Sequence, residues 1–307
     1  MTTQTTTPTL VHSREELAAA LAVQDVQAVP RSEGRGAHTA RPHRRAVVMT
    51  MGALHAGHLS LVAKARELAD AVVVTIFVNP LQFGAGEDLS RYPRDLHGDL
   101  ALLSGPGLLG PDDIVFAPGP DVVYPDGDPI VRVSAGAIGD VLEGVSRPGH
   151  LDGVLTVVLK LLHLTRPDVA LFGRKDAQQL AAVRRMVRDL DVPVVVHGAP
   201  LVRDEDGIAL SSRNAYLSAD EHRRALGLSQ ALRLGAQEQT ADDIRSTALD
   251  TLRAAGVDEV HYVALVDPET FEEVSSTFAG EALLLVAARV GTTRLIDNDT
   301  VTVGGPA

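Results

Sequence analysis

The chain has 307 residues, with 40 acidic and 28 basic side chains and a formal net charge of −12. This length is enough to bury a sizeable core and to divide into two domains, whereas the charge has the wrong sign for a protein whose main partner is a nucleic-acid backbone. The lack of any cysteine excludes disulfides, thiolate zinc sites and a cysteine nucleophile. Because no apolar run approaches the roughly 20 residues of a membrane-spanning helix and no signal pattern opens the chain, we expect a soluble cytoplasmic protein that binds no membrane.

Two stretches near the amino terminus carry no apolar periodicity. Residues 1–8 are a Thr-rich polar tail, and residues 31–45 (RSEGRGAHTARPHRR) are rich in glycine, arginine and histidine. This composition favours loops or disordered segments. We therefore expect the deletion of 31–45 to leave activity and thermal stability nearly unchanged.

From residue 46 onward, β-rich runs alternate with segments of helical periodicity. The expected strands are 46–50, 71–78, 113–117, 168–173 and 192–198. The expected helices are 57–70, 151–165 and 176–190. Such alternation is typical of a parallel sheet with helices on both faces. The fold class is therefore α/β, and we predict a Rossmann-like domain over residues 1–200.

The pattern changes near residue 200. Two polar amphipathic segments, SADEHRRALGLSQALRLGAQ and TADDIRSTALDTLRAAG, each open with a Ser or Thr and an acidic first turn, which is a helix-start signal. Strands are expected to follow at 259–266 and 282–290. We predict a smaller α+β domain over residues 201–307.

A pair of histidines stands where the first of these strands becomes a helix. In VVMTMGALHAGHLSLVAKARELAD (47–70), His55 and His58 lie three positions apart, on one face of the coming helix. A helix amino terminus carries unpaired N–H groups and a partial positive charge, so it attracts phosphate, and two imidazoles would add side-chain donors. Gly52 and Gly57 would let the backbone approach a ligand closely. The pair is therefore a candidate polyphosphate site.

Other interpretations of the pair remain open on these residues alone. Two histidines at this spacing are often surface residues. A zinc site is disfavoured because the metalloprotease spacing with its glutamate is absent and no cysteine can complete the ligand set. A dinucleotide site is disfavoured because the first strand-turn-helix lacks G-x-G-x-x-G.

Six motifs in order along the chain decide between these interpretations. MGALHAGH (51–58) is a variant of the His-x-Gly-His signature of nucleotidyltransferases. The other five are IFVNPLQFGAGEDLSRYPR (76–94), LEGVSRPGHLDGVLTVV (142–158), FGRKDAQQL (172–180), LSSRNAYL (210–217) and TRLIDN (293–298). From about residue 46 to 300, the chain closely resembles the pantothenate synthetases, the pantoate–β-alanine ligase family of the His-signature nucleotidyltransferase superfamily.

This resemblance implies an ATP-dependent ligation in two steps. Pantoate is adenylated with loss of pyrophosphate, and β-alanine then attacks the acyl adenylate to give pantothenate and AMP. The first step gathers negative charge on the phosphates, so it needs cations and preorganised donors more than a base. The family also implies magnesium as the companion of ATP and a homodimer.

The resemblance also assigns site residues by their match to the motifs. The catalytic residues would be His55, His58 and Lys175. ATP would be bound by these three together with Met51, Gly52, Gly173, Asp176, Val202, Leu210, Ser211, Ser212 and Arg213. Pantoate would be bound by Gln82, Gln179, Met51, Asn79 and Tyr92. Because part of the ATP set lies after residue 200, the second domain would act as a lid.

Some positions have weaker or unusual assignments. Asp99 is the candidate magnesium ligand, although the LHGDL run around it lacks an acidic residue that the family often has. Arg147 and His150 receive no catalytic role. Arg174 replaces a frequent glutamate beside Lys175 and leaves the local electrostatics in doubt, whereas the replacements at Met49 and Leu210 are apolar and concern packing alone.

Two other functions are compatible with the superfamily. The first is another His-signature adenylyltransferase of cofactor biosynthesis, which would need neither the glutamine pair nor a second acceptor site. The second is a catalytically silent ATP-binding protein, which the retention of the whole phosphate set disfavours. A tRNA-charging enzyme is disfavoured by the acidic balance.

Overall fold

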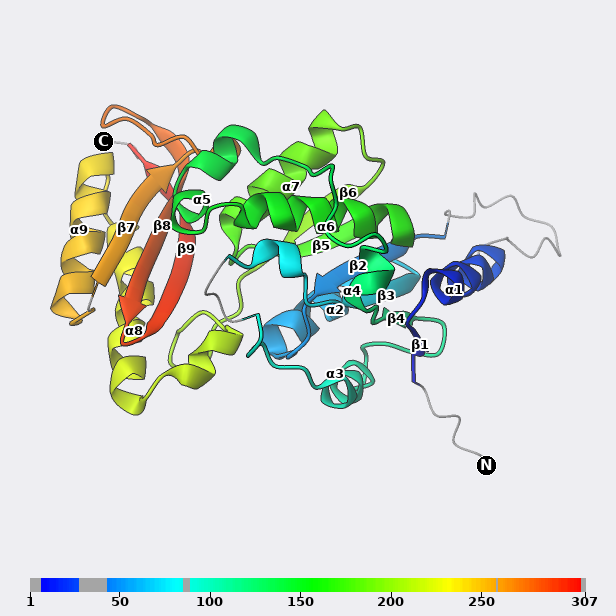
Figure 1. Ribbon diagram of the computed structural model, residues 1–307. Coiled ribbons are helices and arrows are strands. Elements are labelled where there is room, and N and C mark those ends of the chain that lie inside the picture. Colours follow the sequence, from blue (N-terminus) through cyan, green and yellow to red (C-terminus); the bar gives the residue numbers. More distant parts are fainter. Residues whose placement is uncertain (1–6, 28–42, 85–88, 258, 305–307) are drawn as a thin grey trace, which may run out of the picture.

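The computed structural model describes residues 7–27, 43–84, 89–257 and 259–304, and its larger part is built on a parallel sheet (Figure 1). The six strands are β1 (Thr9–Val11), β2 (Arg45–Thr50), β3 (Ala71–Ile76), β4 (Ile114–Phe116), β5 (Val169–Gly173) and β6 (Val195–Ala199). They pair in the order β1-β4-β3-β2-β5-β6, always in parallel. The strand order reverses between β2 and β5, and open α/β sheets bind ligands outside the carboxyl ends of the strands at such a point.

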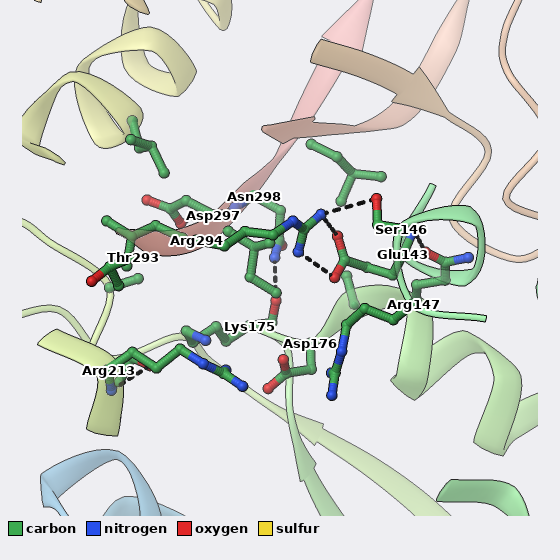
Figure 2. Close-up of a pocket in the computed structure, with 18 of the residues that line it drawn as sticks. Glu143, Ser146, Arg147, Lys175, Asp176, Arg213, Thr293, Arg294, Asp297 and Asn298 are labelled. Carbon is green, nitrogen blue, oxygen red and sulfur yellow. Dashed lines mark hydrogen bonds and ion pairs between the residues drawn. The ribbon is translucent and has the colours of Figure 1, made fainter. Parts of the chain in front are cut away.

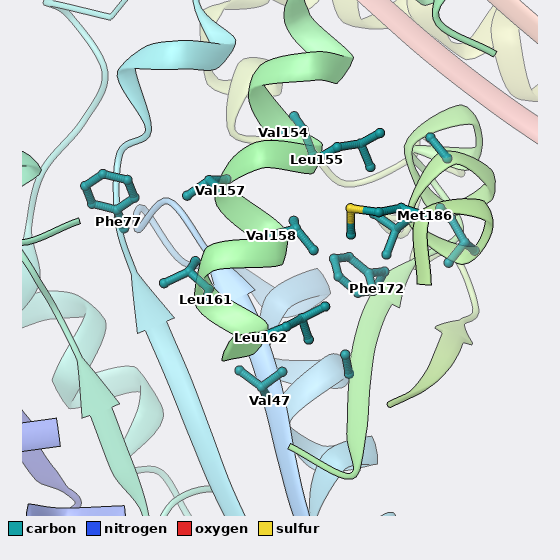
Figure 3. Close-up of a cluster of buried hydrophobic side chains, with 14 of the residues drawn as sticks. Val47, Phe77, Val154, Leu155, Val157, Val158, Leu161, Leu162, Phe172 and Met186 are labelled. Atoms are coloured by element: carbon teal, nitrogen blue, oxygen red, sulfur yellow. The ribbon is translucent and has the colours of Figure 1, made fainter. Parts of the chain in front are cut away.

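Helices cover both faces of this sheet. They are α1 (Arg14–Gln27), α2 (Ala56–Leu68), α3 (Leu96–Leu103), α4 (Pro120–Val123), α5 (Glu143–Ser146), α6 (His150–Thr165) and α7 (Ala177–Asp189), with the 3₁₀ helices η1 (Pro80–Gln82) and η2 (Gly136–Asp140). Val47 packs in the cluster that contains α1, α6 and α7 (Figure 3), whereas Val48 packs in the cluster that contains α2 and α3. Alternate residues of a strand point to opposite faces, so both faces are buried. The predicted Rossmann-like fold is confirmed.

The carboxyl-terminal part carries a separate antiparallel sheet with helices, which agrees with the predicted smaller α+β unit. Its strands are β7 (Glu259–Val266), β8 (Gly280–Val290) and β9 (Thr293–Val303), in the order β7-β8-β9. The helices are α8 (Ala219–Gly235), α9 (Ala241–Ala254) and the 3₁₀ helix η3 (Ser212–Tyr216). Leu284 packs with α8 and α9, whereas Leu285 belongs to the cluster of α6 and α7. The second sheet therefore shares a hydrophobic core with the first part of the chain.

Some elements were not predicted from the sequence. β1 and α1 precede the first expected strand, and β1 is a three-residue strand at the edge of the sheet. β9 interrupts its apolar residues with Arg294, Asp297 and Asn298, so its sequence reads as polar. In the fold, those polar residues line a cavity, which explains why a buried strand carries them.

Arg45 corrects the expectation for the segment 31–45. Its side chain is buried at the start of β2, and its guanidinium donates to Gln24 Oε1 at 2.8 Å and to Asp25 Oδ1 at 2.6 Å, both on α1. A buried guanidinium held in this way ties α1 to the sheet, so deletion through residue 45 would damage the fold. The rest of the expectation, for residues 1–6 and 31–42, falls outside the described residues.

Within the described ranges, no helix has both the length and the apolar character needed to cross a bilayer.

Candidate active site

The predicted site residues converge on one cavity of about 260 Å³ at the carboxyl ends of β2 and β5. Its wall includes Met51, His55, His58, Asn79, Gln82, Tyr92, Gly173, Lys175, Asp176, Gln179, Val202, Leu210, Ser211, Ser212 and Arg213. Of the predicted residues, Gly52 and Asp99 do not line it. The fold therefore places at the switch point of the sheet the residues that motif matching selected from distant segments.

A larger cavity of about 860 Å³ lies between the parallel sheet and the C-terminal sheet. Lys175, Asp176, Gln179, Arg213 and three other residues line both cavities, so the two cavities are adjacent. Figure 2 shows the ends of Arg147 and Arg213 on either side of Asp176. The polar end of the site therefore opens toward the C-terminal sheet.

His55 and His58 cap the helix that they begin. The Gly57 N–H donates to His55 Nδ1 at 3.1 Å, and the His55 N–H donates to His58 Nδ1 at 3.4 Å, so the two rings form a reciprocal capping box at the start of α2. Imidazoles here do what serine and glutamate do in the usual capping box. Because each Nδ1 accepts a backbone N–H, the proton of each neutral ring lies on Nε2.

Burial keeps both rings neutral. It lowers the pKa of His55, with help from the positive charge of Lys175, and it lowers the pKa of His58 to about 4, with help from His55. The ring centroids are 4.2 Å apart, which makes protonation of both rings unfavourable. The pair therefore offers two neutral Nε2–H donors to the cavity, and the helix N–H groups that it caps are partly used within the protein.

Lys175 and Asp176 lie in the turn from β5 to α7. Asp176 stands at the N-cap of α7 without a side-chain capping bond, and its carboxylate is exposed to the cavity. Burial among protein atoms would raise the pKa of Asp176, but the positive charges of Lys175 and Arg213 lead a group of cations that hold it below its usual value. The site thus contains one ionised carboxylate among several cations.

The loop after β6 supplies the opposite wall. The Leu210 N–H donates to the carbonyl of Val202 at 2.9 Å, which brings two apolar side chains to the cavity. Ser211 Oγ then accepts the Arg213 N–H at 3.3 Å at the start of η3, and Ser212 lies between them. An apolar stretch followed at once by hydroxyls and a guanidinium suits a ligand with a flat apolar end and a charged end.

Asn79 departs from its predicted role. Its Oδ1 accepts from the Leu81 N–H at 3.3 Å and the Tyr124 hydroxyl at 2.8 Å, and its Nδ2 donates to Gln82 Oε1 at 3.2 Å and to the Gly153 carbonyl at 3.1 Å. These four bonds use the whole hydrogen-bonding capacity of the amide. Asn79 therefore holds the amide of Gln82 in place. Both residues lie in the cavity wall, but the amide of Asn79 has no hydrogen-bonding group left for a ligand.

Gly52 and Asp99 form the support under the histidine turn. Gly52 has a φ of 84°, which favours glycine, and a side chain there would meet Asp99 Oδ2. Asp99 is 3% exposed, and its oxygens accept the N–H groups of Ala53 at 3.1 Å and Leu54 at 2.8 Å. Both residues shape the turn from outside the cavity, and the geometry does not support Asp99 as a magnesium ligand.

Arg147 and His150, to which the motifs assigned no catalytic role, also line the site. Both line the two cavities, and Arg147 Nη1 lies 2.9 Å from His150 Nε2. His150 Nδ1 is 2.8 Å from the Gln82 carbonyl, so it donates there and Nε2 accepts from the guanidinium. The signal was the motif SRPGHLDGV itself, which looked like a simple turn.

Arg174 does not contribute its charge to the cavity. Its N–H donates to the Ala199 carbonyl at 2.9 Å and its Nε to the Gly198 carbonyl at 3.2 Å, so the side chain follows the edge strand β6. It is absent from the walls of both cavities. The charge reversal noted in the sequence therefore falls on the outer side of the turn.

A preformed metal cage is not found. Among the described residues, no group of three or more His, Cys, Asp or Glu side chains is arranged to hold a metal ion. The carboxylate that faces the cavity among the predicted residues is Asp176. A divalent cation would therefore need oxygen ligands from a bound molecule.

A parallel α/β sheet with paired neutral imidazoles and several cations at its switch point defines an enzyme that acts on a phosphate-bearing nucleotide. The chain belongs to the pantoate–β-alanine ligase family, whose model matches residues 22–300. This membership confirms the family predicted from the six motifs.

Individual relatives agree over nearly the whole chain. The pantothenate synthetase of Streptomyces avermitilis is 52% identical, with 86% of this chain and 94% of that protein covered. That of Thermobifida fusca is 55% identical, with 85% and 90% covered. The crystal structure of pantothenate synthetase from Thermus thermophilus has a TM-score of 0.82 at 44% identity and covers 95% of this chain and 98% of its own. The pantoate–β-alanine ligase of Francisella tularensis, complexed with β-γ ATP and β-alanine, has a TM-score of 0.73 at 29% identity and covers 95% and 97%.

Proposed function

We propose that the chain condenses pantoate with β-alanine to pantothenate through a pantoyl adenylate, with ATP as the third substrate. The observation that carries this proposal is the single cavity in which two neutral histidines, a lysine, an arginine and two glutamines meet at the switch point of the sheet. The Francisella relative with ATP and β-alanine supports the same substrates.

ATP binding is assigned to the phosphate end and the apolar wall of the cavity. His55 and His58 would donate their Nε2–H groups to the phosphates, and Lys175 and Arg213 would supply positive charge. Val202, Leu210, Met51 and Gly173 would form the surface for the base and sugar, and Ser211 and Ser212 would add hydroxyl donors. Preorganised donors of this kind act where charge develops on departing pyrophosphate.

Pantoate is assigned to the opposite end. Its carboxylate oxygen attacks the α-phosphorus, and the bond to the β-phosphate oxygen breaks. Gln82 and Gln179 would bind its hydroxyls, and Met51 and Tyr92 would pack on its methyl groups. In the second step the β-alanine nitrogen attacks the acyl carbon and AMP leaves. Asn79 would act through Gln82, which it orients by the 3.2 Å bond between their amides.

Magnesium fits this site as a companion of the phosphates. Asp176 is the ionised carboxylate that would share the ion with phosphate oxygens, and such sharing is typical of magnesium at nucleotide sites. The ion would neutralise charge on the phosphates. The rest of the charge would be balanced by the cations already in the walls.

The C-terminal part would act as a lid, and the chain would function as a cytoplasmic homodimer. Residues 201–213, which include Val202, Leu210 and Arg213, supply one wall of the cavity, and this supports the lid. Ile130 is 101% and Val131 86% exposed, so two neighbouring apolar side chains are available to contact a second copy. Light scattering after gel filtration tests this: Ile130→Lys should convert a dimer to a monomer, and a monomeric wild type would refute the dimer.

The decisive experiment separates the two half-reactions. Enzyme with ATP, magnesium and pantoate should exchange labelled pyrophosphate into ATP without β-alanine, and β-alanine should then release AMP and pantothenate in equal amounts. An acid without the pantoate hydroxyls should support far less exchange, because the glutamines would face unpaired groups. No pantoate-dependent exchange would refute the adenylate pathway, and exchange driven instead by a cofactor precursor would identify an adenylyltransferase.

A further inference from the structure

The motif TRLIDN on β9 has no role in the proposed reaction, yet it reaches the catalytic turn. The Asn298 Nδ2 group donates to the carbonyl of Lys175 at 2.8 Å and to the carbonyl of Arg174 at 3.1 Å. Figure 2 shows this amide pointing from the C-terminal sheet toward the main chain of Lys175. Asn298 is 8% exposed, and its two hydrogen bonds to the turn are partly buried.

The turn that carries Lys175 has few other supports. The Arg174 N–H and Nε are bonded to β6, but the N-cap of α7, Asp176, makes no side-chain capping bond. The two carbonyls bonded by Asn298 directly precede this helix start. If the amide were removed, two partly buried acceptors would lose their donor, and the turn would lose the contact that fixes its peptide planes.

Asp297, the residue before Asn298, contacts the loop after β6 that forms the opposite wall of the cavity. Asp297 accepts from Arg203 Nη1 at 2.6 Å and from Nη2 at 3.1 Å, and its Oδ1 also accepts the Asn298 N–H at 2.8 Å. Arg203 belongs to the loop that brings Val202 and Leu210 to the cavity. Two consecutive residues of β9 thus contact the lysine turn and the apolar wall, and the Asp297 bond fixes the strand from which the Asn298 amide projects.

We propose that Asn298 is a positioning residue that holds Lys175 in place through the main chain of the 174–175 turn. The C-terminal sheet would then contribute to adenylation before any substrate binds, by fixing the position of Lys175 in the parallel-sheet part of the chain. The inference rests on the proposed role of Lys175 at the phosphates. A displacement of about 1 Å in a group that acts on the transition state can cost up to a hundredfold in rate.

The test uses two variants that remove the amide in different ways. Asn298→Ala leaves a gap, whereas Asn298→Leu keeps nearly the same volume without a donor. Both should lower the maximal rate of pantoate-dependent pyrophosphate exchange by about tenfold to a hundredfold, with the KM for pantoate within about twofold of wild type. Asp299→Asn, on the exposed neighbouring residue of β9, is the control and should retain the wild-type rate.

A double-mutant cycle separates positioning from a general structural role. If Asn298 acts through Lys175, adding Asn298→Leu to Lys175→Ala should lower the residual exchange rate no further. An equal loss in both backgrounds, or a wild-type rate in Asn298→Leu, would overturn the proposal. Hydrogen exchange of the 174–177 amides, faster in Asn298→Leu than in Asp299→Asn, is the expected second readout, and unchanged exchange would also overturn it.

Failure of the underlying function would look different. In that case wild-type enzyme would show no pantoate-dependent exchange at all. The hydrogen-exchange comparison would still report whether Asn298 fixes the turn.

Discussion

The two strand-to-helix turns that meet at the site, residues 51–58 after β2 and 173–176 after β5, are held in different ways. The first is braced within the parallel-sheet half, by its own two histidines and by Asp99 on α3. The second starts α7 without a side-chain cap and receives a buried amide from Asn298, 123 positions later in the chain. The donor pair is therefore complete within the first half, whereas the cation opposite it depends on the docked C-terminal sheet.

The largest effect is expected at the second turn. Lys175→Ala should lower the rate of pantoate-dependent exchange by about a hundredfold or more, roughly 3 kcal/mol, because it removes a preorganised cation from developing charge. Unfolding should change little. Lys64→Ala, on an α2 lysine whose side chain is 36% exposed, is the control and should be neutral. A wild-type exchange rate in Lys175→Ala would show that the second turn does not supply a cation to the reaction.

At the first turn we expect an effect on the free energy of unfolding that is about as large, in kcal/mol, as the effect of Lys175→Ala on the activation free energy. The pKa of His58 is about 4 in the fold against an ordinary value of 6.5, so the unfolded chain binds more protons between these values. Stability from this residue is therefore present above about pH 6.5 and is lost as the pH falls toward 4, by at most about 3 kcal/mol.

Denaturant unfolding at a series of pH values measures this loss. His58→Asn should flatten the dependence, because an amide oxygen can accept the His55 N–H in place of the ring without titrating in this range. An unchanged pH slope in the variant would show that the first turn does not depend on a neutral ring.

A smaller effect is expected from the support of the first turn. Asp99→Ala leaves two backbone N–H groups without their acceptor and should cost about 1–3 kcal/mol of unfolding free energy. The magnesium concentration for half-maximal exchange should stay unchanged, since Asp99 lies outside the cavity. Asp126→Ala, on an exposed acid, is the control for stability. A strongly raised magnesium requirement in Asp99→Ala would restore the metal assignment.

The smallest effect is expected for Arg174→Glu. The Arg174 guanidinium follows β6, so reversing its charge at the exposed edge should change the exchange rate by less than about twofold. A tenfold change, measured in the same assay at two salt concentrations, would show that the outer side of the second turn controls Lys175 electrostatically.

Much of the fold and site was readable from the sequence because the relevant signals are local. Strand runs of branched residues and amphipathic helices have fixed periods, and these predicted β2 to β6 and β7 to β8 with small errors at the ends. Residues in the turns, such as His55 and Lys175, belong to motifs that can be recognised from the order of the residues along the chain. Folding then brought these turns together at neighbouring strand ends, as a parallel sheet requires.

Only the tertiary structure decided which polar groups remain available to a ligand. Asn79 and Asp99 matched the motifs, but partners up to 74 and 46 positions away use their bonding capacity. Arg147 looked like part of a turn, but the fold places it, at the end of α5, beside Gln82. Asn298 lies in the motif TRLIDN, but the motif did not indicate what its amide does, because that depends on the two carbonyls that the fold sets against it. The sequence by itself determined which elements form and which groups they carry, and three-dimensional packing determined which of those groups face the cavity.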